Sequence, residues 1–315
     1  MTIRKIAVLF PGQGSQYVGM GREFAESDPE AMDIFNLADL VCGKELKRLC
    51  FEGPLEELTM AANLQPALTA VNLVCWQALR KAGVQVDFVA GHSLGEYAAL
   101  CAAQVLGVED TLRMVAHRGR VMGMAGVRNP GGMVAILGLG MAEIKAILAE
   151  VDQPDSITIG NYNSEQQFVL SGAKGSLAKA ADLALSRGGK AVHLNVSIAN
   201  HSPLMSSAVP EFEQVFAGVT LDRPSIPLIF NVTAKTEEDP EEIRAIMSRQ
   251  IVSMVRWQEI IAGLVASGAN IFIEVGPKKV LSGLLKRALP KGEGHRCYQV
   301  DSPETLRLCL AEVAP

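Results

Sequence analysis

The stretch Gly91-His92-Ser93-Leu94-Gly95 holds the residues of this chain that are best suited to chemistry, because it matches the G-x-S-x-G pattern of a nucleophile elbow. Glycines on both sides of the serine leave room for a turn in which a side chain would clash. The same pattern also arises by chance in strand–turn–helix connections. We predict nucleophilic catalysis by Ser93, which requires a base within hydrogen-bond reach.

A strand and a helix must position that serine. Residues 88–90 form a short apolar run before the turn, and residues 98–103 are rich in alanine after it. We therefore expect strand, sharp turn and helix in that order. The free N–H groups at the start of the helix would face any negative charge that develops at Ser93.

Five histidines are candidates for the base, namely His92, His117, His193, His201 and His295. His92 adjoins Ser93, but a tight turn directs neighbouring side chains away from each other. His201 lies where the chain returns to the main body, just before Ser202-Pro203, which we predict to cap a helix. Position alone favours His201, with a surface histidine beside a helix cap as the alternative.

The composition limits the classes of function. The chain has 315 residues, a formal net charge of -5 and 49% hydrophobic residues, which predict a sizeable core and argue against nucleic acid as main partner. No apolar run is long enough to cross a membrane. Six cysteines without a C-x-x-C pair indicate buried thiols in a reducing cytoplasm; they are Cys42, Cys50, Cys75, Cys101, Cys297 and Cys309.

The first predicted strand, residues 3–10, leads into a glycine-rich turn at residues 11–16. A dinucleotide-binding turn would need a third glycine where Tyr17 stands, and no Walker A sequence is present. We expect the turn to bring backbone N–H groups close to another part of the molecule. Helices are predicted at residues 65–83 and 108–125.

Strands alternate with helices over most of the chain, which together with the elbow predicts a parallel-sheet, α/β-hydrolase-like core. Near residues 129–196 the order becomes β-α-β-β-α-β, as in ferredoxin-like subdomains. We expect a main domain of residues 1–128 and 197–315, an inserted subdomain of residues 129–196, and a cleft between them. Strands are predicted at residues 133–139, 156–162, 168–171, 190–196, 228–232, 270–275 and 297–300.

Four motifs occur in the order seen in malonyl-CoA:acyl carrier protein transacylases, and the chain resembles that family over nearly its whole length. The motifs are Phe10-Pro11-Gly12-Gln13-Gly14-Ser15-Gln16, Gly91-His92-Ser93-Leu94-Gly95-Glu96-Tyr97, Asn200-His201-Ser202-Pro203-Leu204-Met205 and Glu274-Val275-Gly276-Pro277. Gln65-Pro66-Ala67-Leu68 and Asn161-Tyr162-Asn163-Ser164 also look like the family.

The resemblance implies a Ser93–His201 dyad in which a main-chain carbonyl, expected at Ser253, orients the histidine. It implies an oxyanion hole made by the backbone N–H groups of Gln13 and Leu94. Such donors would face the charge that develops on a thioester oxygen.

The resemblance also implies that Arg118 binds the free carboxylate of a malonyl group, for which the planar guanidinium is suited. The alternative is an arginine on a solvated helix face, which we expect of Arg120. Pocket positions implied by the family are Gln65, Asn163 and Asn200. Asn200 departs from the Phe or Ser that the family often has there, which leaves the choice of acyl group less constrained.

The function implied is ping-pong transfer of a malonyl group from malonyl-CoA to the phosphopantetheine thiol of an acyl carrier protein, in cytoplasmic fatty acid synthesis. No metal or other cofactor, nucleic acid or membrane is implied. A polyketide-pathway acyltransferase and an editing acyl hydrolase remain alternatives on the same scaffold. An α/β-hydrolase esterase is disfavoured by the missing acid, and a non-catalytic scaffold by Ser93 and His201.

A carrier protein is acidic, so an acidic chain needs a local basic patch to bind it. The densest such cluster in the main body is Lys278, Lys279, Lys286 and Arg287, beside the Gly276-Pro277 turn. An ordinary solvated helix face is the alternative interpretation. The other candidate surface lies on the inserted subdomain, around Lys174, Lys179 and Lys190.

Overall fold

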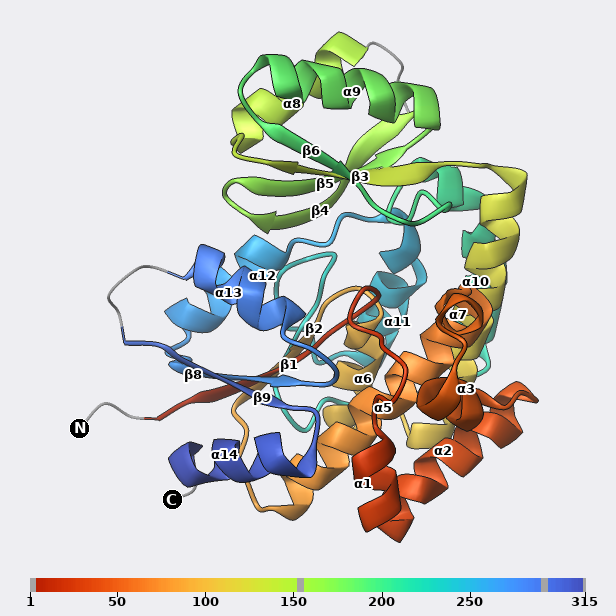
Figure 1. The fold of residues 1–315 in the computed structure, drawn as a ribbon, viewed down its shortest axis with the longest axis vertical. Helices are drawn as coiled ribbons and strands as arrows, with labels where there is room; N and C mark the ends of the chain where they lie inside the picture. The colour runs from red at the N-terminus through yellow and green to blue at the C-terminus, as the bar shows by residue number, and fades with distance from the viewer. Residues whose placement is uncertain (1–3, 152–155, 290–293, 314–315) are drawn as a thin grey trace.

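The computed structural model describes residues 4–151, 156–289 and 294–313. Two sheets lie one above the other in Figure 1, each with helices packed against it. The larger sheet belongs to the main body and the smaller one to the middle of the chain. This arrangement leaves the carboxyl ends of the central strands between the two layers.

The larger sheet has five parallel strands in the order β7-β2-β1-β8-β9. Its strands are β1 (Ile6–Phe10), β2 (Phe88–Gly91), β7 (Leu228–Ile229), β8 (Ile271–Val275) and β9 (Arg296–Val300). In a parallel sheet the carboxyl ends of all strands lie at one edge, which is where active sites of such folds are found. The turn after β1 and the turn after β2 are therefore neighbours.

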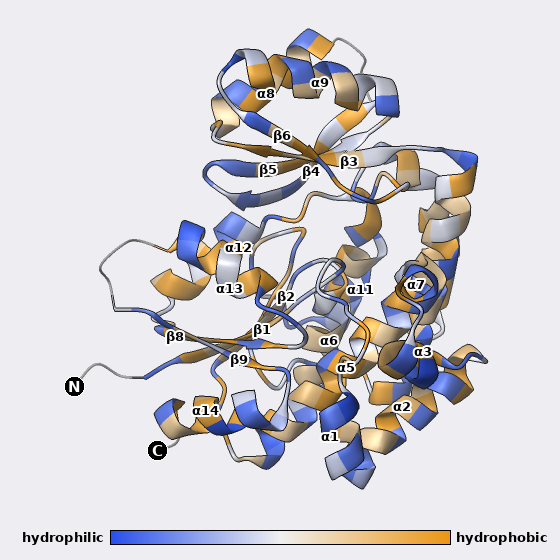
Figure 2. Cartoon of the chain, in the orientation of Figure 1, coloured by the Kyte–Doolittle hydropathy of each residue, from blue (hydrophilic) through white to orange (hydrophobic). Residues whose placement is uncertain are grey.

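The sequence of β1 explains its central place. All five residues are buried, as expected for a parallel strand covered on both faces. Ile6, Val8 and Phe10 belong to the large hydrophobic core, whereas Ala7 and Leu9 pack on the opposite side of the sheet. Figure 2 shows hydrophobic and hydrophilic residues alternating along the helices around the sheet, as expected for helices with one buried and one exposed face.

Helices cover both faces of this sheet. The helices of the main body are α1 (Arg22–Ser27), α2 (Pro29–Cys42), α3 (Leu46–Glu52), α4 (Leu55–Thr59), α5 (Ala61–Lys81), α6 (Gly95–Ala102), α7 (Val108–Arg128), α10 (Val209–Ala217), α11 (Pro240–Ser248), α12 (Trp257–Ala266), α13 (Val280–Ala288) and α14 (Pro303–Val313), with 3-10 turns η1 (Pro203–Ala208) and η2 (Gln250–Val252). Residues of α5, α6 and α7 contribute to the large core, and those of α12 and α13 to the other face.

The helix α5 begins four residues earlier than the sequence pattern predicted and contains Pro66. Proline has no N–H to donate to the carbonyl four residues before it, here that of Ala62. The ammonium of Lys44 donates to this carbonyl at 3.1 Å instead. A side chain from another segment therefore lets the helix continue through the proline.

The smaller sheet has four antiparallel strands in the order β4-β5-β3-β6. Its elements are β3 (Gly132–Leu137), α8 (Met141–Val151), β4 (Ile157–Ser164), β5 (Gln167–Gly172), α9 (Lys174–Ser186) and β6 (Lys190–His193). Both helices pack on one face through a separate hydrophobic cluster. The predicted fold class, a parallel α/β core with a ferredoxin-like insertion, is confirmed.

Three strands, β3, β6 and β7, end earlier than predicted, and the last two do so for the same physical reason. The strand β7 stops at Ile229 because the backbone N–H of Asn231 donates to the Glu96 carboxylate rather than to a neighbouring strand. The strand β6 stops at His193, since the N–H of Val196 donates to the carbonyl of Leu194. Local hydrogen bonds have replaced the ladder in both places.

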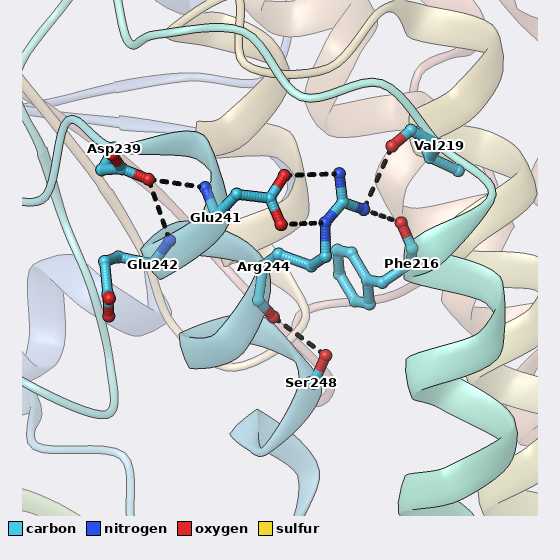
Figure 3. A network of polar contacts seen from close by, with 7 residues as sticks. All are labelled: Phe216, Val219, Asp239, Glu241, Glu242, Arg244 and Ser248. Atoms are coloured by element: carbon cyan, nitrogen blue, oxygen red, sulfur yellow. Dashed lines mark hydrogen bonds and ion pairs between the residues drawn. The ribbon is translucent and has the colours of Figure 1, made fainter.

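Ser202 precedes a helical turn with Pro203 at its first position, as predicted, but its side chain does not cap that turn. The hydroxyl of Ser202 donates to the carbonyl of Ala199 at 2.7 Å, and a 3-10 turn follows instead of an α-helix. Asp239 does cap a helix with its side chain: its carboxylate accepts from the N–H groups of Glu241 and Glu242 at the start of α11 (Figure 3).

The helix α11 is also fixed to the end of α10. The guanidinium of Arg244 donates to the carbonyls of Phe216 and Val219 and contacts the carboxylate of Glu241 (Figure 3). The hydroxyl of Ser248 closes the last turn by donating to the carbonyl of Arg244 at 2.9 Å. The turn η2 begins at Gln250, two residues after α11 ends. The contacts of Arg244 and Ser248 therefore help to fix the position of Gln250.

Candidate active site

Ser93 lies at the tip of the turn between β2 and α6, with a backbone φ of 51°. Non-glycine residues rarely adopt this left-handed conformation. The flanking glycines are required by close approach: a Cβ on Gly91 would lie 2.0 Å from the carbonyl carbon of Gly95, and one on Gly95 would lie 2.0 Å from the carbonyl oxygen of Phe10. The turn is a strained strand-to-helix elbow that exposes the serine hydroxyl.

The hydroxyl of Ser93 lies 2.7 Å from Nε2 of His201. Nδ1 of His201 lies 3.0 Å from the carbonyl oxygen of Gln250 and 3.0 Å from that of Ser253. Both carbonyls can only accept, so Nδ1 carries the proton and Nε2 is left as an acceptor. The imidazole is thus in the tautomer that can take a proton from Ser93.

Burial keeps this imidazole neutral. His201 is 2% exposed. Removal from water, together with the nearby positive charge of Arg118, lowers the pKa of His201 from 6.5 to about 3. A neutral imidazole with a free Nε2 lone pair is available at neutral pH, as general-base chemistry requires.

The other histidines lie elsewhere. Nε2 of His92 is 2.9 Å from Oδ1 of Asn163, so its ring points away from Ser93 as expected. His117 lies 3.6 Å from the carboxylate of Glu211 on the far side of α7. His193 is exposed on β6, and His295 immediately precedes β9.

The turn after β1 reaches the elbow. The N–H of His92 donates to the carbonyl of Phe10 at 3.0 Å, which joins the two turns. Gln13 and Leu94 both line a cavity of about 90 Å³ that also contains Ser93 and His201. Within the described residues, the backbone N–H groups of Gln13 and Leu94 donate to no protein acceptor. They remain available to an oxygen atom bound beside Ser93.

Arg118 extends from α7 into the same cavity and is 1% exposed. Its Nη2 lies 3.2 Å from Oγ of Ser93 and 3.1 Å from Oε1 of Gln250, while Nη1 donates to Oε1 of Gln65. Its Nε is buried and has no hydrogen-bond partner among the described residues. Burial lowers the pKa of Arg118, but guanidinium stays protonated in proteins.

The acceptors around Arg118 are neutral amides and a hydroxyl, and it forms no ion pair with a carboxylate in the described part of the chain. Arg120, two residues later, is exposed and pairs with Glu211 at 3.0 Å. A buried cation without an anionic partner is costly, so the cavity has capacity for an anionic group beside Ser93.

The remaining predicted pocket residues lie at different depths. Gln65 and Asn200 line the cavity, and in the described part of the chain Oδ1 of Asn200 is buried without a hydrogen-bond partner. Asn163 stands behind His92 as its hydrogen-bond partner. Asn161, two residues earlier on β4, lines the cavity itself.

Comparison with known proteins places this geometry in a family. The family model "Acyl transferase domain" matches residues 8–302. A malonyl CoA-acyl carrier protein transacylase of Bacillus subtilis (strain 168) is 38% identical over 308 residues, which are 97% of this chain and 96% of that protein. One of Escherichia coli (strain K12) is 36% identical over 90% of this chain and 92% of its own.

The chain belongs to the malonyl CoA-acyl carrier protein transacylases.

Solved transacylase structures agree. One from Coxiella burnetii is 32% identical with a TM-score of 0.95, covering 100% of this chain and 99% of that one. A transacylase in complex with a type II polyketide synthase acyl carrier protein is 34% identical with a TM-score of 0.93, covering 98% and 99%. The resemblance drawn from the sequence motifs is confirmed, and the chain is an acyltransferase.

Three residues of this transacylase site were missed by the sequence analysis: Gln250, Asn231 and Glu96. Gln250 offers His201 a backbone carbonyl, which no side-chain pattern reveals. Asn231 was assigned to a strand that ends two residues before it. Glu96 stood inside the elbow motif, and its acidic side chain next to an apolar helix was the one available signal.

A second cavity of about 580 Å³ adjoins the first and shares Gln13, Leu194, Val196 and Asn200 with it. Its other lining residues come from the main body, such as Met60, and from the smaller sheet's segment, such as Lys174. Among the described residues, no group of His, Cys, Asp or Glu could hold a metal ion. No helix in that part of the chain is both long and apolar enough to span a membrane.

Proposed function

We propose that this transacylase moves a malonyl group from malonyl-CoA to the phosphopantetheine thiol of acyl carrier protein, in fatty acid synthesis. The observation that carries the proposal is the buried guanidinium of Arg118, which lies 3.2 Å from Oγ of Ser93 and pairs with no carboxylate among the described residues. It can hold a free carboxylate while the thioester end of the same acyl group meets the nucleophile.

In the first half-reaction Ser93 attacks the thioester carbonyl carbon. His201 takes the Oγ proton at Nε2 as the O–C bond forms, and the N–H groups of Gln13 and Leu94 stabilise the oxyanion. The C–S bond then breaks, and the proton on Nε2 passes to the departing sulfur of CoA. A malonyl ester on Ser93 remains.

In the second half-reaction the pantetheine thiol of the carrier protein enters. His201 accepts its proton, the sulfur attacks the ester carbonyl, and the bond between that carbon and Oγ breaks. The proton returns from Nε2 to Ser93. Two carbonyls, those of Ser253 and Gln250, hold the imidazole in the required tautomer throughout.

The acyl pocket is proposed to consist of Arg118 and Gln65 at the carboxylate end, with Asn200 nearer the opening. Asn163 would act on the pocket through His92. Residues 129–196 are proposed to form an inserted subdomain that closes the groove over a main domain of residues 1–128 and 197–315.

The proposed partners are malonyl-CoA and acyl carrier protein, with neither nucleic acid nor membrane involved. The steps above use only protein groups, so we propose that no metal or other cofactor takes part. A cytoplasmic setting is supported by the six cysteines, all present as free thiols.

A polyketide-pathway role is the second candidate. A transacylase named for polyketide biosynthesis in Bacillus subtilis (strain 168) is 39% identical over 90% of this chain. Activity with fatty acid and polyketide carrier proteins, compared side by side, separates the two. An editing hydrolase for uncharged acyl chains is disfavoured by Arg118.

The test is a two-step labelling experiment. Labelled malonyl-CoA should leave an ester on the wild-type chain, and added acyl carrier protein should remove it as malonyl carrier protein. The Ser93→Ala variant should fold normally but take up no label. Label on that variant would disprove the assignment of the nucleophile.

A further inference from the structure

Glu96 is a buried acid that the mechanism above does not use. It lies on α6, one turn after Ser93, and is 0% exposed. Its Oε1 accepts from the backbone N–H of Asn231 at 2.6 Å, and its Oε2 accepts from Nε2 of Gln250 at 2.7 Å. Burying a carboxylate without a direct cationic partner costs free energy. The hydrogen bonds of Glu96 to Asn231 and Gln250 must therefore serve a purpose that offsets this cost.

The two residues that Glu96 binds hold the nucleophile from both sides. Oδ1 of Asn231 accepts from the N–H of Ser93 at 2.7 Å, and Nε2 of Gln250 donates to the carbonyl of Ser93 at 2.9 Å. Ser93 has a left-handed backbone conformation, which persists only when surrounding contacts enforce it. Asn231 and Gln250 supply such contacts.

The Gln250 side chain can face two ways, and Glu96 selects one. A carboxylate accepts only, so it requires the NH₂ end of the Gln250 amide. Oε1 then faces Arg118, where it accepts from Nη2 at 3.1 Å. The reverse orientation would set an NH₂ group against the guanidinium and a carbonyl oxygen against the carbonyl of Ser93.

This arrangement also keeps Arg118 free to bind substrate. Nη1 and Nη2 donate to the neutral amide oxygens of Gln65 and Gln250, not to a carboxylate. The amide of Gln250 lies between the Glu96 carboxylate and the Arg118 guanidinium, so the negative charge of Glu96 acts on Arg118 without a direct contact. A direct ion pair would compete with an incoming carboxylate, whereas an amide between the two charges orients the cation without neutralising it.

We propose that Glu96 is a positioning residue: through the amide of Gln250 it aligns both the Ser93 peptide and the Arg118 guanidinium for an acyl group that carries a carboxylate. This inference rests on the proposed malonyl transfer and assigns a residue outside the dyad to acyl selectivity. Glu96 touches neither substrate nor reacting atoms.

The decisive variant is Glu96→Gln, which keeps the size of the side chain. Its Oε1 can still accept from Asn231, but its NH₂ then meets the NH₂ of Gln250, and two donors cannot pair. Gln250 must turn away from Arg118. We expect kcat/KM for malonyl-CoA to fall about tenfold more than kcat/KM for acetyl-CoA, since one misdirected buried hydrogen bond is worth about that factor.

Glu274→Gln is the matched control. Glu274 is equally buried, and its carboxylate accepts from the N–H groups of Leu281 and Ser282 at the start of α13. The same chemical change there should lower the stability of the protein without changing the ratio of malonyl to acetyl transfer.

A double-mutant cycle with Gln250→Leu locates the effect. If Glu96 acts through the Gln250 amide, Glu96→Gln should shift the malonyl-to-acetyl ratio no further once that amide is gone. Should Glu96→Gln not fold, Gln250→Leu alone is expected to lower the ratio, and an unchanged ratio would overturn the proposal.

Two results with Glu96→Gln overturn the inference. One is a malonyl-to-acetyl ratio equal to that of Glu274→Gln, and the other is a full additive shift in the Gln250→Leu background. Failure of the proposed function looks different, because the wild-type chain itself would then form no malonyl ester.

Discussion

The residue-scale feature that most restricts the substrate is a buried arginine beside a nucleophilic serine, paired with no carboxylate among the residues that the structure describes. Arg118 is 1% exposed, and its neighbours are amides and a hydroxyl. A cation in this environment gains most from a ligand that brings its own negative charge. The uncharged end of the same ligand must reach Ser93, which selects short acyl groups with a terminal carboxylate.

Replacing Arg118 with alanine should therefore change selectivity more than activity. A buried charge-assisted pair contributes about 2–3 kcal/mol, so the preference for malonyl over acetyl should fall about thirtyfold to a hundredfold. Stopped-flow acylation with both CoA esters measures this. Arg120→Ala, on the exposed side of the same helix, is the control, and equal losses for both substrates would make Arg118 structural.

His201 should leave a signature in stability. Its pKa is about 3 in the folded chain against an ordinary 6.5, so its contribution is fully present above 6.5 and is lost as the pH falls toward 3. Compared with His201→Gln, the wild type should lose about 2 kcal/mol of unfolding free energy between about pH 7.5 and about pH 5. Urea unfolding at both pH values measures the difference, which should vanish if the imidazole is protonated when folded.

Sequence alone was enough for part of this site. Ser93 followed from its glycines and His201 was favoured by its position, because side chains that perform chemistry lie in recognisable turns. Gln250 and Asn231 could not be found in this way, since they act through a backbone carbonyl and through amides that meet Ser93 only after folding. Their roles depend on long-range geometry that no local pattern records.

At the scale of elements, the path from α10 through α11 to η2 fixes the carbonyls that orient His201. Arg244 ties α11 to the last carbonyls of α10, and Asp239 caps the start of α11 (Figure 3). Gln250 and Ser253 follow within the next few residues. Catalytic alignment thus depends on how firmly a surface helix is held.

Arg244→Ala should loosen that path. The carbonyls of Phe216 and Val219 would lose their donor, at a cost of about 1–3 kcal/mol in unfolding free energy. Acylation of Ser93 should also slow, because the carbonyls that orient His201 follow α11 directly. Chemical denaturation and acylation rates of Arg244→Ala should be compared with those of Arg307→Ala, whose exposed pair with Glu304 contributes little. Equal effects of the two variants would contradict this argument.

Most elements could be predicted from periodicity, and the exceptions share a cause. Hydrophobic runs in the sequence marked the strands of both sheets. The hydroxyl of Ser202 bonds backward to Ala199, and β7 ends where Asn231 turns to Glu96. Competing hydrogen-bond partners that are brought close only by the fold decided these cases.

At the scale of the whole molecule, a groove between the two layers leads to Ser93. Residues from both layers line the larger cavity, of about 580 Å³. It shares lining residues with the smaller cavity around the dyad. The thioester of malonyl-CoA and the phosphopantetheine thiol of the carrier protein must both reach Ser93. The surface around this groove is therefore where a carrier protein has to bind.

The basic cluster at Lys278 and Lys279 is one candidate for that surface, and both side chains are exposed at the carboxyl end of β8. Charge reversal of both should raise KM for the acidic carrier protein at low salt and leave acylation by malonyl-CoA unchanged. The effect should shrink as salt rises. Lys235→Glu, at an exposed position after the terminal strand β7, is the control.

Unchanged carrier-protein kinetics at low salt would instead move the binding surface to the smaller layer. Lys174 lines the groove there, Lys179 lies on the same helix, α9, and Lys190 lies on β6. Charge reversal at Lys174 would then be the variant that raises KM for the carrier protein.

Two backbone hydrogen bonds join the smaller layer to the main body near His201. The N–H of Val255 donates to the carbonyl of Gly160, and the N–H of Tyr162 donates to the carbonyl of Val255, so β4 is bonded to the chain two residues after Ser253. Any hinge motion that lifts the smaller layer must break this bridge or pull on the carbonyl that holds the imidazole. An opening that admits the second thiol would therefore also displace His201, the proton acceptor. The acyl-enzyme would then be least able to activate water at the moment when water can enter.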